Sequence, residues 1–149
     1  MSAFSAIESG TLPHAERQRV SALLRISNPQ QRLARLVEEA RRRPALPPEF
    51  RTDRYRVEGC LVRLWFVAEV RDGRCCFRCD SDAVTLKAVI GLLCDLYSGR
   101  TAEELAHANS ELLSELRILH QLAENRQRTI ARVAEKIRLF ALQQRQAAA

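Results

Sequence analysis

The sequence predicts an α+β fold in which a small antiparallel sheet of about three strands packs against several helices. Three observations lead to this fold class. Apolar residues recur with a helical period up to residue 43 and again from Ser81 onward. Between residues 55 and 79 the period changes to two, which is typical of half-buried strands. The pair Asp72-Gly73 separates two alternating stretches and is a strong hairpin signal.

Two helices are expected before the sheet. The first begins at Pro13, and its apolar side is formed by Val20, Leu23 and Leu24. Asn28 is expected to cap the second helix, with Pro29 in the first turn, where its missing N–H costs nothing. The apolar stripe of this second helix consists of Leu33, Leu36, Val37 and Ala40. The helix stops before a rigid proline-containing connector at residues 44–48.

The sheet is expected from three extended segments. In residues 61–70 the even positions are apolar, while Arg63 and Glu69 point the other way. The second segment, residues 74–79, has an apolar face made of Cys75, Phe77 and Cys79. A shorter piece at residues 55–57 completes the expected sheet, and three strands are near the minimum for independent packing.

Helical patterning resumes after the sheet and continues along the rest of the chain. One helix ends at Gly99 and is lined by Leu86, Val89, Ile90, Leu93 and Leu96. Thr101 and Glu104 form a capping box for the next helix, and Ser110 is expected to restart a short one. The last helix is expected to cover one face of the sheet with Ile130, Val133, Ile137 and Phe140.

The chain is expected to form one domain over residues 13–146, after a flexible leader at residues 1–12. Its 149 residues, 46% of them hydrophobic and 28% charged, have the balance of a folded globular protein. The longest uncharged apolar run, residues 88–94, is far below the roughly 18 residues that a membrane span requires. No Lys or Arg precedes Arg17, which argues against a secretory signal. We therefore expect a cytoplasmic protein without a membrane partner.

The formal net charge of +6 comes almost entirely from arginine, with 22 Arg against 2 Lys. This charge is spread along the chain, because residues 1–58, 59–100 and 101–149 carry +4, +1 and +1. The densest run, three arginines at residues 41–43, has no interleaved aromatic residue, although single-strand binders need stacking platforms beside their basic groups. We therefore expect no nucleic-acid partner and interpret the run as a solvated helix end. Nucleic-acid binding stays an open hypothesis, and it requires an affinity that falls steeply with salt.

Four of the five cysteines are interpreted as packing residues. Cys76 and Cys79 form a C-x-x-C pattern, which is typical of zinc or redox sites. In a strand, however, residues i and i+3 face opposite sides roughly 10 Å apart, beyond the reach of a disulfide. A zinc site needs two more ligands, and the three histidines show no H-x-x-x-H spacing. We therefore expect no metal, and Cys75, Cys79 and Cys94 are expected to behave as small hydrophobes.

Cys60 differs from the other cysteines because it lies between two extended segments, directly after Gly59. Glycine beside the thiol lets the backbone of a partner approach closely. Arg54, Arg56 and Arg63 are near in sequence, and neighbouring cations favour the reactive thiolate. These residues leave two interpretations open, a reactive thiol in a tight loop or one more buried core residue.

Several motifs surround this cysteine in a fixed order. They are V-x-G-C at residues 57–60, a strand with Trp65, D-S-D at residues 80–82, Y-S-G-x-T-x-E-E at residues 97–104, and an L-x-x-x-R element ending at Arg126. Together they resemble the SufE/CsdE family, over roughly residues 27–142. Members of that family are sulfur acceptors for cysteine desulfurases in iron–sulfur cluster assembly. Several motifs in the right order are more specific than a single C-x-x-C.

The resemblance implies a SufE/IscU-like fold and a sulfur-transfer function. By this match Cys60 stands where the family has its sulfur-accepting cysteine. Its thiolate would take sulfur from the persulfide of a PLP-dependent cysteine desulfurase of the SufS/CsdA type, activate that enzyme, and pass the sulfur to an iron–sulfur scaffold complex. The chain would carry no cofactor, because the PLP belongs to the desulfurase. It would be a persulfide carrier, an accessory protein rather than an independent turnover enzyme.

The resemblance also assigns residues around Cys60. Asp80, Ser81 and Asp82 match the D-S-D element of the family and are expected to hold the cysteine loop, to cap the following helix, or both. Arg126 matches an arginine near the same site and is expected to contact the loop or the desulfurase.

The residues after Cys60 leave two functions open. Family members shelter the loop in an apolar cavity until the partner draws it out, and Trp65 and Leu64 are expected to wall that cavity or to be plain strand core. Leu61 and Val62, however, replace two small polar residues of the family. A second hypothesis is therefore a noncatalytic interaction module that keeps the fold and has lost sulfur transfer.

Overall fold

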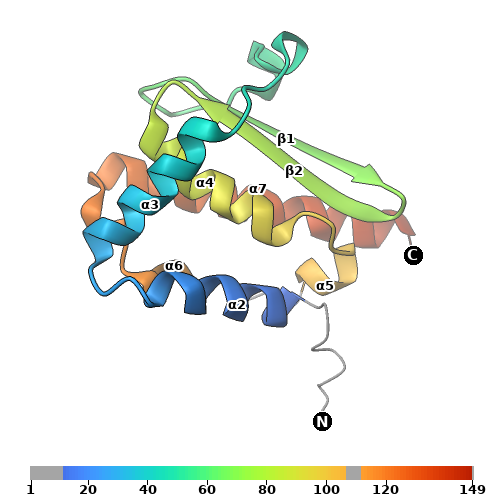
Figure 1. Cartoon of the computed structure of the whole chain (residues 1–149). Coiled ribbons are helices and arrows are strands. Elements are labelled where there is room, and N and C mark those ends of the chain that lie inside the picture. Colours follow the sequence, from blue (N-terminus) through green and yellow to red (C-terminus); the bar gives the residue numbers. More distant parts are fainter. Residues whose placement is uncertain (1–11, 107–111, 149) are drawn as a thin grey trace.

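A computed structural model describes residues 12–106 and 112–148 and confirms the α+β architecture (Figure 1). The helices are α2 (Leu12–Leu24), α3 (Pro29–Arg42), α4 (Val84–Tyr97), α5 (Ala102–Ala106), α6 (Leu112–Leu116) and α7 (Glu124–Ala148). The strands are β1 (Leu64–Arg71) and β2 (Arg74–Ser81), and the 3₁₀ turns are η1 (Pro48–Phe50), η2 (Asp53–Tyr55) and η3 (Leu119–Gln121). Residues 1–11 of the expected leader, and Ser110 at the expected start of a short helix, lie outside the described residues, and residue 12 of that leader belongs to α2.

The capping signals read from the sequence are confirmed at two helices. The Asn28 side chain accepts hydrogen bonds from the backbone N–H groups of Gln30 at 2.7 Å and Gln31 at 3.3 Å, at the start of α3. Before α5, the Thr101 hydroxyl accepts from the N–H of Glu104 at 3.2 Å, and the Glu104 carboxylate accepts from the N–H of Thr101 at 2.8 Å. Caps of this kind each stabilise a helix by about 1 kcal/mol.

The hairpin forms as expected, with different strand limits. Asp72 and Gly73 have positive φ angles of 51° and 76°, which a two-residue hairpin turn requires. The register places Leu64 opposite Ser81. The expected strand start at residue 61 is therefore wrong, because β1 begins at Leu64 and the preceding residues form a loop. Likewise, Ser81 ends β2 instead of starting a helix.

The expected third strand is also wrong among the described residues. Residues 55–57 contribute a single bridge, Arg56 opposite Trp65, beside a two-stranded sheet. The reason is that the N–H groups of Tyr55 and Arg56 are already bonded, at 3.0 and 3.2 Å, to carbonyls of the η2 turn. Only the N–H of Val57 reaches β1, where it donates to the carbonyl of Leu64 at 2.9 Å.

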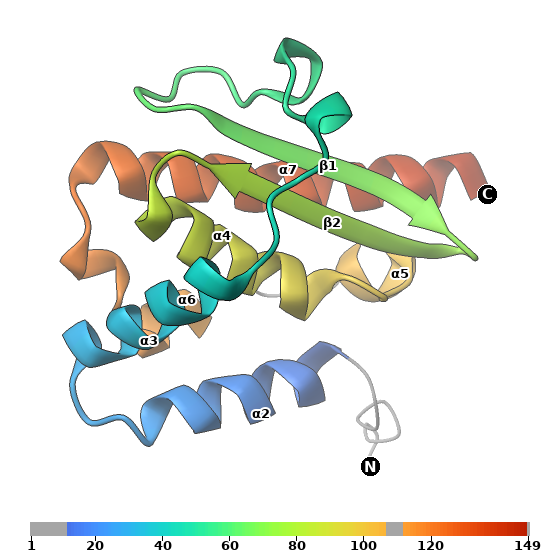
Figure 2. The ribbon, with the colours of Figure 1, turned by 45° about the horizontal axis from the view of Figure 1, so that its top comes forward.

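Helix α4 is the centre of the molecule, with the sheet above it, α7 beside it and α2 on the far side (Figure 2). Most of its side chains are buried. Three rings connect the sheet to α7: Phe66 stacks on Phe77 at 5.8 Å between centroids, and Phe140 contacts Phe77 edge-on at 5.8 Å. The apolar stripe of α7 thus covers the sheet as expected. Each such side chain stabilises the fold by about 1.5–3 kcal/mol when fully buried.

The opposite face of the sheet is covered by the proline connector. Leu46 of the connector, with Trp65 and Val67 of β1, forms a second and smaller buried cluster. Phe50 and Tyr55 pack against this cluster and contact one another edge-on at 5.3 Å. The first half of β1 is consequently buried on both faces.

Candidate functional site

Cys60 lies in a six-residue loop, residues 58–63, which is called the Cys60 loop below. Its base is closed by the hydrogen bond from the Val57 N–H to the Leu64 carbonyl. Gly59 adopts a φ of +83°, a conformation that side-chain-bearing residues rarely tolerate. This glycine turns the chain so that Cys60 packs against the main core. The next residue, Leu61, points outward with 85% of its surface exposed.

The thiol of Cys60 makes a specific contact with α7. Its Sγ donates to the hydroxyl oxygen of Thr129 at 3.6 Å, and that hydroxyl donates to the carbonyl of Asn125 at 3.0 Å. Thr129 is itself buried, whereas Cys60 is half-buried. The hydrogen bond to Thr129 therefore holds the Cys60 side chain in a sheltered position against α7.

A second residue of α7 holds the same loop. The guanidinium of Arg132 donates to the backbone carbonyl of Glu58, and a Cβ on Gly59 would overlap that guanidinium. Arg132 follows Thr129 by three residues, so both lie on one side of α7. Sequence reasoning missed both residues. The sequence did hold a signal for them, because Thr129 and Arg132 are three residues apart on a helix that was already expected to cover the sheet.

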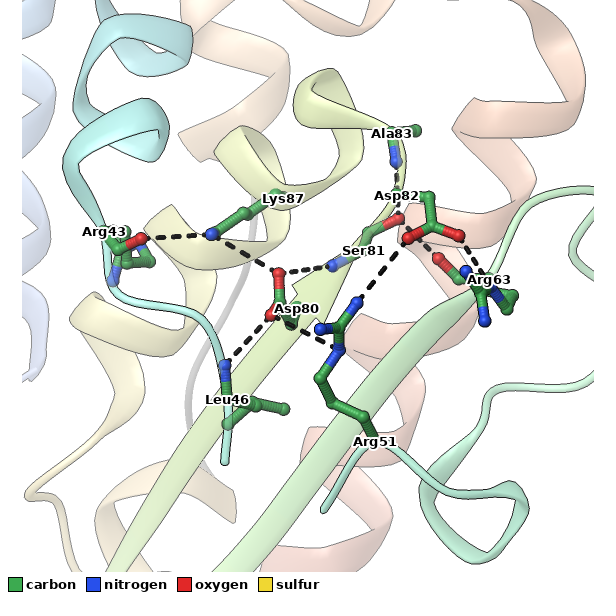
Figure 3. A network of polar contacts seen from close by, with 9 residues as sticks. All are labelled: Arg43, Leu46, Arg51, Arg63, Asp80, Ser81, Asp82, Ala83 and Lys87. Carbon is green, nitrogen blue, oxygen red and sulfur yellow. Dashed lines mark hydrogen bonds and ion pairs between the residues drawn. The ribbon is translucent and has the colours of Figure 1, made fainter. Parts of the chain in front are cut away.

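The D-S-D element lies at the other end of the loop, where β2 meets α4 (Figure 3). The Asp80 carboxylate is buried and accepts from the backbone N–H of Leu46 at 3.0 Å and of Ser81 at 2.9 Å. Two cations face it, Lys87 Nζ at 3.4 Å and Arg51 Nε at 3.8 Å. Asp80 thus ties the connector, β2 and α4 together, and its contact with the loop is indirect.

Ser81 and Asp82 contact the loop itself, through Arg63 (Figure 3). The Ser81 hydroxyl donates to the Arg63 carbonyl at 2.7 Å, and the N–H of Asp82 donates to the same carbonyl at 3.1 Å. The Asp82 carboxylate accepts from the Arg63 guanidinium at 2.7 Å. Ser81 also accepts from the N–H of Ala83, just before α4. This element therefore holds the loop, as expected. The expected helix capping is wrong, because Ala83 is the N-cap residue of α4 and no side chain caps that helix.

Trp65 and Leu64 do not form one wall beside Cys60. Leu64 is fully buried in the main core, against which Cys60 also packs. Trp65 lies in the smaller cluster on the opposite face of the sheet, because neighbouring strand residues point to opposite sides. The guanidiniums of Arg51 and Arg63 lie over its ring at 4.6 and 5.4 Å from the centroid. The expected cavity-wall role of Trp65 is thus wrong, and Trp65 anchors the connector instead.

The expected contact between Arg126 and the loop is not made. The guanidinium of Arg126 donates to the hydroxyl of Thr85, which joins the first turn of α7 to the first turn of α4. Arg126 lies three residues before Thr129, too far toward the start of the helix for the loop. Arg56, in contrast, is exposed and lines a groove between η2 and α7 that borders Gly59.

The other cysteines lie in the sheet and in α4. Burial, and to a lesser extent the neighbouring Cys76, raises the pKa of the Cys75 thiol. A hydrogen bond with Cys79, together with burial, raises the pKa of Cys94 well above its ordinary value. Raised pKa values make these two thiols poor nucleophiles at neutral pH. Cys76 is half-buried on the other side of β2 from Cys75 and Cys79.

Metal ligation and membrane insertion find no support in the described residues. No group of three or more His, Cys, Asp or Glu side chains within residues 12–106 and 112–148 is placed to hold a metal ion. No helix in the same segments is long and apolar enough to cross a membrane.

Known proteins of similar sequence share most of this chain. It is 26% identical over 108 residues to an uncharacterised SufE-like protein of Rhizobium etli, covering 69% of this chain and 73% of that protein. A SufE-like protein of Synechocystis is 24% identical over 105 residues, with 70% and 66% covered. A chloroplastic quinolinate synthase of Arabidopsis thaliana is 28% identical over 108 residues. That match covers 72% of this chain and spans only 15% of the plant protein.

A solved structure of similar fold and a match to a protein family point in the same direction as these relatives. The solution structure of a hypothetical protein from Thermus thermophilus superposes with a TM-score of 0.68 at 19% identity, covering 87% of this chain and 95% of that one. The SufE family, described as an Fe-S metabolism associated domain, matches residues 17–141. This range includes α3, the sheet, the Cys60 loop and most of α7. The chain therefore belongs to the SufE family.

Proposed function

We propose that this protein is a persulfide carrier that accepts sulfur at Cys60 from a PLP-dependent cysteine desulfurase and passes it to an iron–sulfur scaffold. The observation that carries the proposal is the position of Cys60. Its thiol lies in a loop with an outward-pointing neighbour, whereas the other four cysteines lie on β2 and α4. Membership of a family of Fe-S metabolism domains supports sulfur transfer as the chemistry of this thiol.

The transfer step is a thiol exchange without net oxidation. The Cys60 thiolate attacks the outer sulfur of the persulfide on the desulfurase cysteine, and a new S–S bond forms at Cys60. The bond between the desulfurase cysteine and that outer sulfur breaks, and its electron pair leaves as the desulfurase thiolate. The proton lost by Cys60 balances the one that this thiolate regains. Removal of the persulfide frees the desulfurase for another turnover, which is how the carrier would activate it.

The loop has to leave its resting position for this step. The thiol proton is directed at Thr129, and one side of Cys60 packs against the core. Attack on a partner's persulfide requires a thiolate with access to the outer sulfur. The two contacts from α7 are therefore the ones that must break, while the contacts to Ser81 and Asp82 can stay. A sheltered resting state would also protect a bound persulfide from other thiols.

The direct test is mass spectrometry of the protein after incubation with a cysteine desulfurase and cysteine. A mass increase of one sulfur atom is expected on the wild-type chain and should be absent from Cys60→Ser. Cys76→Ser is the matched control, because Cys76 is also half-buried but lies on a strand. That control should still gain the sulfur.

Two results would contradict the proposal. One is a wild-type chain that stays unmodified while the desulfurase turns over, and the other is unchanged labelling in Cys60→Ser. Binding of the desulfurase without sulfur transfer or stimulation would instead identify a noncatalytic interaction module. Binding and turnover therefore have to be measured separately in the same experiment.

A further inference from the structure

A basic groove runs along the Cys60 loop, between η2 and α7. It has a volume of about 1020 Å³ and reaches the backbone at Gly59. Five cations line it: Arg54, Arg56, Arg128, Arg132 and Lys136. The acidic side chains of the lining are Asp53, Glu58 and Glu135, so the lining carries a formal excess of two positive charges.

The acidic side chains of the groove do not neutralise all of the cations that line it. The Glu135 carboxylate is taken by Arg138, whose Nε donates to it at 3.0 Å. Arg132, three residues before Glu135, donates instead to a neutral acceptor, the backbone carbonyl of Glu58. Among the described residues, Arg56 and Lys136 make no ion pair. The groove therefore presents charge that an anionic partner can use.

Arg132 connects this charge to the position of the loop. A guanidinium binds a carboxylate through charge-assisted, often bidentate hydrogen bonds, which are about twice as strong as bonds between neutral groups. A partner carboxylate entering the groove would therefore compete with the Glu58 carbonyl for Arg132. The released carbonyl belongs to an exposed residue, so water can take the place of the lost hydrogen bond. Of the two polar contacts from α7 to the loop among the described residues, only the one between Cys60 and Thr129 would then remain.

We propose that the basic groove is the docking site for an acidic segment of the sulfur-donating partner, and that Arg132 links occupation of the groove to release of the Cys60 loop. The inference rests on the proposed function for the identity of the partner. The groove itself is defined by charge and geometry alone. Leu139, 44% exposed in the groove wall, adds an apolar contact for the same segment.

The test uses the full chain and a fluorescein-labelled octaglutamate peptide as the probe. Binding is followed by fluorescence anisotropy at low salt, with octalysine as the peptide of opposite charge. Octaglutamate should bind the wild-type protein, and the double variant Arg128→Gln/Lys136→Gln should bind it about fivefold more weakly. The matched control is Arg41→Gln/Arg42→Gln, which removes two exposed charges from α3 and should bind as the wild type does. Equal weakening in both double variants, or no binding at all, would overturn the docking site.

The link to the loop is measured by the rate at which iodoacetamide alkylates Cys60, read at that residue by peptide mapping. Octaglutamate should accelerate alkylation of the wild-type chain. Arg132→Gln should react roughly threefold to tenfold faster without the peptide and gain nothing when it is added. Arg145→Gln is the control, because it removes an exposed charge from the same helix outside the groove and away from the loop, and it should keep the slow wild-type rate. A wild-type rate in Arg132→Gln would overturn the link.

These measurements use no desulfurase. Failure of sulfur transfer would therefore leave both results standing, and failure of the groove would leave the sulfur-transfer test intact. Circular dichroism of each variant checks that the changes in rate do not come from unfolding.

Discussion

The two ends of the Cys60 loop are fixed in different ways. At the end toward β1, the carbonyl of Arg63 accepts one hydrogen bond from the Ser81 hydroxyl and one from the Asp82 N–H. The guanidinium of Arg63 is paired with the Asp82 carboxylate. At the other end, α7 holds the loop with one guanidinium and one thiol contact, from Arg132 and Thr129 respectively. The contacts at the Arg63 end belong to a larger network around the buried Asp80. The two contacts from α7 share no partner with that network.

This difference assigns a mechanical role to each end. Contacts at the Arg63 end share partners, because Arg51 and Arg63 both pair with Asp82 and Arg51 also faces Asp80. Loss of one contact therefore leaves the others in place. Contacts at the α7 end are single and partly exposed, so water can replace what is lost. We therefore expect the end at Arg63 to act as the hinge and the end at Glu58 to open. Four experiments, taken from the largest expected effect to the smallest, sharpen or break this distinction.

Replacement of Asp80 by Ala should cause the largest loss of stability. The change leaves Lys87, which is mostly buried, without its carboxylate and removes acceptors from two backbone N–H groups. We expect the free energy of unfolding, measured in urea, to fall by about 3 kcal/mol. Glu124→Ala, which removes the exposed partner of Arg128, is the control and should unfold at the wild-type urea concentration. Similar unfolding of both variants would contradict the distinction between the two ends.

Alkaline pH should destabilise the fold through the buried thiols of β2 and α4, which lie outside both ends of the loop. The pKa values of Cys94 and Cys75 are raised above 9.0 in the folded state, by a hydrogen bond with Cys79 and burial in one case and by burial in the other. Above pH 9 the unfolded chain therefore binds fewer protons than the folded one, and stability falls as pH rises. The slope is at most about 1.4 kcal/mol per pH unit for each thiol.

Urea unfolding between about pH 8 and pH 10 measures this slope. Well below pH 9 the contribution of the two thiols should be constant, because both states keep their protons. Cys94→Ala should give a shallower decline above pH 9 than the wild type. An identical decline in the two proteins would show that Cys94 plays no part in it.

Replacement of Thr129 by Val should loosen the α7 end while leaving the fold intact. The variant keeps the shape of the side chain and removes the hydroxyl that accepts from the Cys60 thiol. Loss of one such hydrogen bond, about 0.5–1 kcal/mol, should raise the rate of Cys60 alkylation roughly twofold to fivefold. Thr129→Ser restores the hydroxyl and should restore the slow rate. A valine variant with the wild-type rate would show that this contact does not restrain the loop.

Replacement of Leu61 by Gln should have the smallest effect on folding. The Leu61 side chain is 85% exposed, so its removal costs almost no buried apolar surface. Thermal unfolding should therefore be unchanged, whereas affinity for the desulfurase should fall by about threefold if Leu61 is covered in the complex. Leu24→Gln, at an exposed leucine on α2, is the matched control and should bind normally. Equal affinity of the two variants would remove Leu61 from the contact surface.

Local signals in the sequence predicted much of the fold. The cap at Asn28, the box of Thr101 and Glu104, and the turn at Asp72-Gly73 all depend on neighbours within a few residues, and all are confirmed. The third strand was expected from a short extended piece at residues 55–57. It failed because two of its N–H groups are bonded within a 3₁₀ turn, which alternation of residue types does not reveal.

The site was predictable at its cysteine and less so around it. The order of motifs singled out Cys60 and the D-S-D element, but a strand places neighbouring side chains on opposite faces, which separates the Trp65 ring from Cys60. The partners on α7 depend on how a distant helix is rotated against the loop. Thr129 and Arg132 contact the loop, while Arg126, one turn before Thr129 on the same side of α7, reaches Thr85 of α4 instead.

The closed base of the loop limits how far its sulfur can travel. Cys60 follows Val57 by three residues, and an extended chain spans at most about 3.5 Å per residue, so its Cα can move to about 10 Å from that base. The hydrogen bond between Val57 and Leu64 sets this tether length. If the reactive sulfur of the partner lies within this distance of the loop base, movement of the loop alone can bring Cys60 to it. If the sulfur lies farther away, the first residues of β1 would have to separate from β2. That separation would disrupt the buried cluster around Trp65.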